Sequence, residues 1–117
     1  TSFFWFPALA EKNLVQLIKQ LRKDFNAPNA NFVCATLGQT AKGAEGNEGH
    51  ILNAQLAVDG ETGKYPEFKG NVASVYSKPF CHGGASNGHY SRNPETYMDI
   101  GEEMGRAMAR LIVNGKK

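Results

Sequence analysis

The chain has 117 residues, enough for one domain with one core, because single domains usually have about 100 to 150 residues. Hydrophobic residues at 41% and charged residues at 21% are typical of a globular protein and exclude a disordered or fibrous one. The net charge of +2 comes from basic and acidic residues scattered along the chain, so the sequence offers no basic surface for nucleic acid.

The cysteines and the apolar runs bear on whether the chain contains disulfides or a membrane span. Cys34 and Cys81 are too few for a disulfide framework, so both are expected to be reduced, and the compartment stays unknown. The longest apolar runs are far shorter than the roughly 20 residues of a membrane span, so no membrane partner is expected. Because the first residue is Thr1 and not methionine, we expect an upstream segment that was removed or not included.

The first part of the chain predicts a strand, a helix and a second strand. The aromatic stretch Ser2–Phe6 stops at Pro7, as expected of a short buried strand. Pro7 can open a helix, and apolar residues then recur at helical spacing over about Ala8–Phe25. Asn31–Leu37 is a continuous apolar run closed by Gly38, which is the pattern of a parallel strand covered on both faces.

The middle of the chain repeats this pattern. Residues Gln39–Gly49 are rich in glycine and polar side chains and predict an exposed loop. Asn47 is a candidate cap for a second helix that ends near Asp59-Gly60. After a loop with several turn residues, Asn71–Ser77 predicts the third strand.

The last helix follows a loop rich in glycine, serine and histidine. Asn93 is its expected cap, and Pro94 fits the first helical position. We expect its buried stripe to contain Tyr97, Ile100, Gly101, Met104, Gly105, Met108, Leu111 and Ile112. The two glycines, four residues apart, would let the helix pack closely on its neighbour.

The alternation of elements predicts an α/β fold with three parallel strands and three helices. Sites in such sheets form beyond the carboxyl ends of the strands, where the loops after Phe6, Leu37 and Ser77 would meet. His89 belongs to the third loop and lies just before the last helix. It is therefore the leading functional candidate, as a general base.

Short motifs along nearly the whole chain resemble one family. They are Phe4-Trp5-Phe6, Glu11-Lys12-Asn13-Leu14 leading to Leu21-Arg22-Lys23-Asp24-Phe25, Phe32-Val33 ending in Gly38, Ala54-Gln55, and His89-Tyr90. In this order they resemble the C-terminal part of the SGNH-type (GDSL-like) esterases, in particular the sialate O-acetylesterase-like carbohydrate esterases. The resemblance implies a truncated three-layer, flavodoxin-like domain, an acetylated carbohydrate as substrate and no cofactor or metal.

The same resemblance implies roles for individual residues. In the family, a serine near the start of the domain is the nucleophile and a late histidine is the base. The histidine corresponds to His89, while Gln39, Gln55 and Tyr90 would bind or border the substrate. The family's orienting aspartate, three positions before the histidine, is replaced by Ser86, and the serine block lies outside the chain. The isolated chain is therefore expected to be inactive.

Other interpretations remain open. Asp99 or Glu95 could orient His89 in place of the missing aspartate, and Ser77 could be a local nucleophile. Zinc ligands could come from Cys81, His82, His89 and His50. The chain could also be a non-catalytic binding or assembly module. Because so few helices would leave strand edges and faces uncovered, a homodimer is expected.

Overall fold

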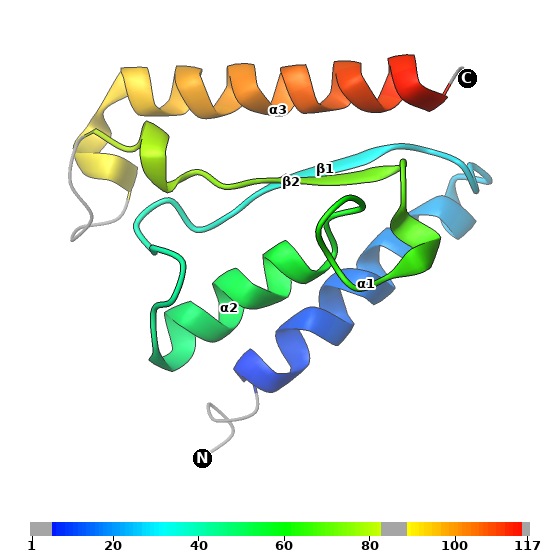
Figure 1. Ribbon diagram of the computed structural model, residues 1–117, viewed down its shortest axis with the longest axis horizontal. Coiled ribbons are helices and arrows are strands. Elements are labelled where there is room, and N and C mark those ends of the chain that lie inside the picture. The colour runs from blue at the N-terminus through cyan, green and yellow to red at the C-terminus, as the bar shows by residue number, and fades with distance from the viewer. Residues whose placement is uncertain (1–5, 83–88, 116–117) are drawn as a thin grey trace.

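The computed structural model describes residues 6–82 and 89–115, which form one α/β unit. This part of the chain contains three α-helices and a two-stranded parallel sheet: α1 (Phe6–Asp24), β1 (Phe32–Ala35), α2 (Gly46–Ala57), β2 (Val72–Val75) and α3 (Pro94–Gly115). The sheet lies between α3 on one side and α1 with α2 on the other (Figure 1). The predicted helices and the second and third predicted strands are confirmed, although both strands are shorter than expected.

The start of α1 differs from the prediction. Phe6 is the first helical residue, so the strand predicted over Ser2–Phe6 is wrong at its last position, and residues 2–5 lie outside the described part of the chain. Pro7 explains the early start, because its fixed φ and missing N–H suit the first turn of a helix. At the other end, Arg22 anchors the helix by donating to Ala30 O (3.0 Å) and to Asn71 Oδ1 (2.7 Å).

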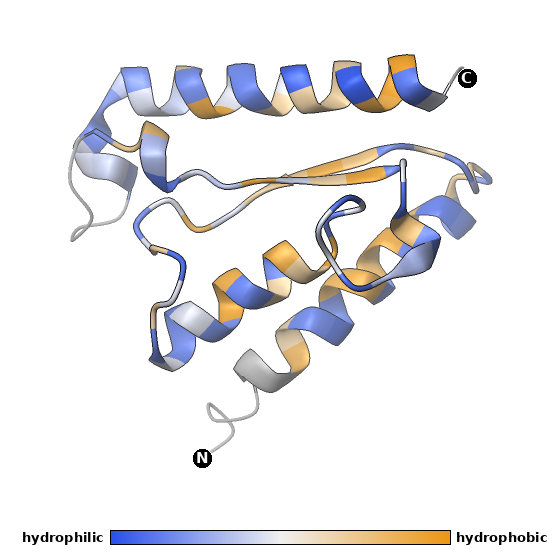
Figure 2. Ribbon diagram, viewed as in Figure 1, coloured by the Kyte–Doolittle hydropathy of each residue, from blue (hydrophilic) through white to orange (hydrophobic). Residues whose placement is uncertain are grey.

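The two strands and α2 form a β-α-β unit. Phe32 pairs with Val72 and Ala35 with Val75 in parallel register. Figure 2 shows that both strands are hydrophobic along much of their length, as expected for strands covered by helices on both faces. Asn47, the predicted cap of α2, lies inside its first turn, because Gly46 with a φ of 74° already directs the chain into the helix.

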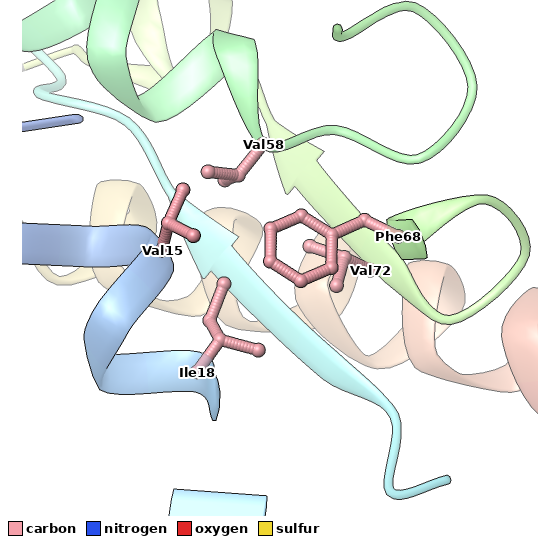
Figure 3. Close-up of a cluster of buried hydrophobic side chains, with 5 residues drawn as sticks. All are labelled: Val15, Ile18, Val58, Phe68 and Val72. Carbon is pink, nitrogen blue, oxygen red and sulfur yellow. The ribbon is translucent and has the colours of Figure 1, made fainter. Parts of the chain in front are cut away.

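The core lies between the sheet and the pair α1 and α2. Val15 and Ile18 of α1, Val58 after α2, and Val72 of β2 surround the ring of Phe68 (Figure 3). Phe68 is fully buried and belongs to the 3-10 turn Pro66–Phe68, within a stretch that the sequence predicts only as a loop. This turn therefore supplies the central residue of the core.

Helix α3 packs on both strands, with Ile100, Ala107 and Leu111 buried. The predicted stripe is partly wrong, because Gly101 and Gly105 are exposed and a Cβ at either position would meet no atom within 4 Å. Tyr97 and Ile112 are also largely exposed. The buried side of α3 is thus narrower than the sequence pattern indicates.

The loop between β1 and α2 is only partly exposed. Residues 41–43 and 45 are exposed as predicted, but Thr40 is buried, and the last residues of the predicted loop, 46–49, belong to α2. Thr40 Oγ1 donates to Glu48 Oε2 (3.3 Å), so the loop is tied to the first turn of α2. In the described part of the chain, no helix has the length and apolar character needed to cross a membrane.

Candidate site at the carboxyl edge of the sheet

The loops that follow β1 and β2 meet at the carboxyl edge of the sheet, as predicted. Ser77 N donates to Thr36 Oγ1 (3.0 Å), and Lys78 Nζ donates to Gln39 O (3.0 Å). Thr36 and Ser77 are both buried, so the hydrogen bond between them is shielded from solvent. These two hydrogen bonds join the loop after β1 to the loop after β2.

Four consecutive residues near this edge adopt a left-handed backbone. His89, Tyr90, Ser91 and Arg92 have φ values of 52°, 49°, 52° and 61°. Left-handed conformation costs a residue with a side chain about 1–2 kcal/mol, and none of the four is glycine. Such strain persists only where surrounding contacts fix it, and it is concentrated at functional sites.

Tyr90 supplies packing contacts that help to hold this turn. Its ring lies over Gly38, so that a Cβ on residue 38 would be 2.4 Å from Tyr90 Cε1 and 2.5 Å from Cys81 Sγ. The ring also packs edge-on against Tyr97, with centroids 5.3 Å apart. The absence of a side chain at Gly38 therefore gives Tyr90 its place between the loop after β1 and the start of α3.

The start of α3 is fixed by a fully buried threonine. Asn93 Oδ1 accepts hydrogen bonds from Thr96 N (2.8 Å) and Thr96 Oγ1 (2.9 Å), which confirms the predicted cap. Thr96 Oγ1 in turn accepts from His82 N (2.9 Å). The loop after β2 is thereby bonded directly to the first turn of α3, just beyond His89.

His89 is exposed beside these joined loops. Within the described residues its imidazole has no hydrogen bond or ion pair, so neither Asp99 nor Glu95 orients it. Asp99 Oδ2 instead lies 3.6 Å from Nε2 of His82. Ser86, which replaces the aspartate of the family, lies outside the described residues.

The hydroxyl groups of the two serines in and directly after β2 donate hydrogen bonds to backbone carbonyls. Ser77 is fully buried, and its Oγ donates to Val75 O (3.4 Å). Ser74 Oγ donates to Gln55 O (2.6 Å). Ser77 is therefore a structural residue at the end of β2 and not an accessible nucleophile.

Of the other predicted site residues, Gln39 and Tyr90 lie at the carboxyl edge, and Gln55 stabilises one of its loops. Gln55 Oε1 accepts from Leu37 N (2.9 Å), so this side chain fixes the loop after β1. Gln39 and Tyr90 are half-buried in the two loops that meet at the edge. Gly38 and Thr96 were not among the predicted site residues. The signals for them were a glycine directly after a strand and a threonine three residues after a helix cap.

The possible metal ligands do not gather. In residues 6–82 and 89–115, no group of three or more His, Cys, Asp and Glu side chains is arranged to hold a metal ion. The cysteines do not act as activated nucleophiles either. Burial raises the pKa of the Cys34 thiol, and burial also raises that of Cys81 in spite of the nearby Lys78. Both therefore stay protonated near neutral pH.

The chain was compared with models of known protein families, with curated proteins and with solved structures, and none of them matches it.

Proposed function

We propose that this chain is the histidine-bearing part of a carbohydrate O-acetylesterase of the SGNH type, in which His89 is the general base. The observation that carries the proposal is the placement of His89. An imidazole without a hydrogen bond or ion pair to any described residue lies at the carboxyl edge of a parallel β-α-β unit, on a strained turn where Tyr90 packs against Gly38. Strained backbone and sheet edges of this kind are where α/β proteins place reactive groups.

In the proposed reaction, His89 takes the proton from the hydroxyl of a serine as its oxygen attacks the acetyl carbonyl. The imidazolium then returns the proton to the sugar oxygen, which leaves as a hydroxyl group. Water next attacks the acetyl-serine with His89 again as base, releasing acetate and the free serine. Ser74 and Ser77 are bonded to backbone carbonyls. Because the family that the chain resembles carries its nucleophile near the start of the domain, before the motifs found here, we assign this role to a serine outside residues 1–117.

We assign different roles to the three residues expected to border the substrate. Tyr90 adjoins His89, and Gln39 lies in the loop after β1, so we assign contact with the sugar to both. Gln55 does not contact the sugar in this proposal, because its amide oxygen already accepts a hydrogen bond from Leu37 N. It positions the loop that carries Gln39.

The test is acetate release from an O-acetylated sugar by the protein as its gene encodes it. His89→Gln is expected to lower kcat by about 10³-fold or more, the usual effect of removing such a base. The matched control is His50→Gln, because His50 is an exposed histidine of α2 with no role in the site. Equal rates for the two variants, or no acetate release by the encoded protein, would refute the proposal.

A second candidate function is a non-catalytic assembly module. It is favoured by a row of exposed apolar side chains, spaced four residues apart, at Leu17 and Leu21 of α1 and at Phe25 directly after it. We propose that this face joins two copies of the chain if the esterase proposal fails. Sedimentation over a wide concentration range tests it, with dimers for the native chain and monomers for Leu21→Glu. A native chain that stays monomeric throughout would refute it.

A further inference from the structure

A hollow of about 480 Å³ lies beside the last turns of α1. Its walls are this end of the helix, the turn that follows it, and the 3-10 turn Pro66–Phe68. In Figure 1 this end of α1 lies next to the start of β1, on the side opposite the carboxyl edge of the sheet. We call it the α1-end hollow. His89 is not among its lining residues, so the hollow is separate from the proposed esterase site.

The side chains that line the α1-end hollow carry an excess of positive charge. Lys19, Arg22 and Lys23 contribute three cations, and Glu67 is the one carboxylate among the described residues that line it. The cations are spaced i, i+3 and i+4 along α1, so they lie on one face of the helix. Like charges at this spacing repel one another, so an anion bound between them would relieve the repulsion.

Arg22 is fixed by the protein and still presents a free group. Its Nε donates to Ala30 O (3.0 Å), and its Nη2 donates to Asn71 Oδ1 (2.7 Å). The guanidinium also lies over the ring of Phe68, 5.8 Å from the centroid. Nη1 has no hydrogen bond within the described chain, where no buried side-chain nitrogen lacks a partner, so Nη1 reaches solvent. A guanidinium fixed along one edge is preorganised to bind an oxyanion through the other.

The two lysines differ in how firmly the fold engages them. Lys19 Nζ lies 3.5 Å from Glu67 Oε2, and both side chains are about half exposed. Lys23 is exposed and has no ion pair or hydrogen bond with any described residue. Backbone N–H groups after the helix already bond to the last carbonyls of α1. Lys23 is therefore available to an anion without loss of any contact seen in the fold.

We propose that the α1-end hollow binds the phosphate group of a small phosphate monoester. A phosphate dianion matches the excess of two positive charges, and its three terminal oxygens suit Arg22 Nη1, Lys23 Nζ and Lys19 Nζ. A carboxylate, with one charge and two oxygens, fits less well. This binding is independent of the proposed esterase activity.

The size of the hollow and its few cations limit the kind of phosphate ligand. A volume of about 480 Å³ is in the range of small-molecule pockets, so it has room for the organic group of the ester. Three cations are too few for the repeated phosphate contacts that hold a nucleic acid. The ligand we infer is therefore a small ester and not a polyanion.

The test is an NMR titration of the ¹⁵N-labelled chain with glucose 6-phosphate, at constant ionic strength and about pH 7.5, where phosphate is mainly a dianion. Shifts at residues 22–26, at Phe68 and at the Arg22 Nε–H are expected to saturate, with half-occupancy near about 1 mM for a few exposed charge contacts. Acetate should bind about tenfold more weakly or worse. No saturable shift at these residues, or acetate binding as tightly as glucose 6-phosphate, would overturn the proposal.

Two further probes identify the source of the phosphate. Inorganic phosphate should bind no more tightly than glucose 6-phosphate, because it lacks the organic group that the hollow has room for. Acetyl-phosphoserine-amide represents a phosphorylated protein segment. Clearly tighter binding of either probe than of glucose 6-phosphate would refute the small ester as ligand.

Variants of the chain locate the binding. Lys23→Gln should weaken glucose 6-phosphate roughly three- to tenfold, and Glu67→Gln should strengthen it by a similar factor, because it removes the carboxylate and releases Lys19. Lys12→Gln is the matched control, since Lys12 is an exposed lysine of α1 outside the hollow. His89→Ala should also leave the affinity unchanged. Equal weakening by Lys12→Gln and Lys23→Gln, or weaker binding by Glu67→Gln, would refute a site in the hollow.

Discussion

Gly38 and Tyr90 interlock at the carboxyl edge of the sheet, where a Cβ on residue 38 would lie 2.4 Å from Tyr90 Cε1. This fit joins the loop after β1 to the strained turn that carries His89. The packing of Tyr90 on Gly38 helps to hold residues 89–92, none of which is glycine, in a left-handed conformation. The position of His89 therefore depends on a residue fifty-one positions earlier in the chain.

Gly38→Ala is expected to destabilise the protein by about 1–3 kcal/mol, because the added methyl group must displace the Tyr90 ring or the Cys81 thiol. Urea unfolding measures the change in free energy. The double variant Gly38→Ala with Tyr90→Ala should lose less than the sum of the two single changes, since the clash is then removed. Strict additivity would contradict the proposed fit.

Alanine in place of Gly101 or Gly105 is expected to stabilise the protein, in contrast to alanine in place of Gly38. Both are exposed within α3, and a methyl group added at either would meet no atom within 4 Å, so alanine at each should stabilise the chain by up to about 1 kcal/mol. Thermal unfolding measures the gain. A loss of stability that disappears on dilution would instead show that these glycines form a helix contact between two copies.

Asp59 should stabilise the fold in a pH-dependent way. Burial opposes its ionisation, but hydrogen bonds from Ser74, Thr62 and Glu61 lower the pKa of this carboxyl below its usual value. Its contribution is therefore present above about pH 4, the pKa in the unfolded chain, and is lost as pH falls through the lower folded value. Asp59→Asn should cost about 1–3 kcal/mol at pH 7 and less at acid pH.

The control for this change is Asp24→Asn, at the exposed end of α1. Its effect on the free energy of unfolding should be within about 0.5 kcal/mol at every pH. Urea unfolding between pH 3 and pH 7 gives both curves. A cost for Asp59→Asn that stays constant down to pH 3 would contradict the role assigned to the ionised carboxylate.

Tyr65 should titrate unusually late. Its hydroxyl donates to Glu11, and this hydrogen bond, with some burial and the nearby negative charges, raises the pKa of Tyr65 to about 12. The contact stabilises the fold below about pH 10, the unfolded pKa, and is lost as pH rises toward 12. Ultraviolet titration of Glu11→Gln should show a lower pKa for one tyrosine. An unchanged titration curve would contradict the contact.

The sequence predicted the helices and both described strands because their apolar residues follow clear periods. Asn93 and Pro94 likewise mark the start of α3 with the residue types that cap and open helices. The prediction failed at Phe6, because an aromatic run that ends at a proline fits a strand and the entry to a helix equally well. It failed at Gly101 and Gly105 because glycine is compatible with either side of a helix.

The candidate site was predicted less completely than the fold. The position of His89 followed from the order of elements, since it lies in the loop after β2. The left-handed turn could not be predicted, because its stability comes from Tyr90 packing on the distant Gly38 and not from a local glycine signal. The burial of Ser77 and the pairing of His82 with Asp99 also depend on contacts across the fold.

The central claim, that His89 activates a serine outside residues 1–117, is tested most directly by labelling the encoded protein with a fluorophosphonate. The serine oxygen attacks phosphorus, fluoride leaves, and the base accepts the proton, so labelling reports the activated pair itself. We predict one labelled serine beyond this chain, with labelling abolished by His89→Gln and retained by His50→Gln. Labelling that survives His89→Gln, or a label on Ser77, would contradict the account.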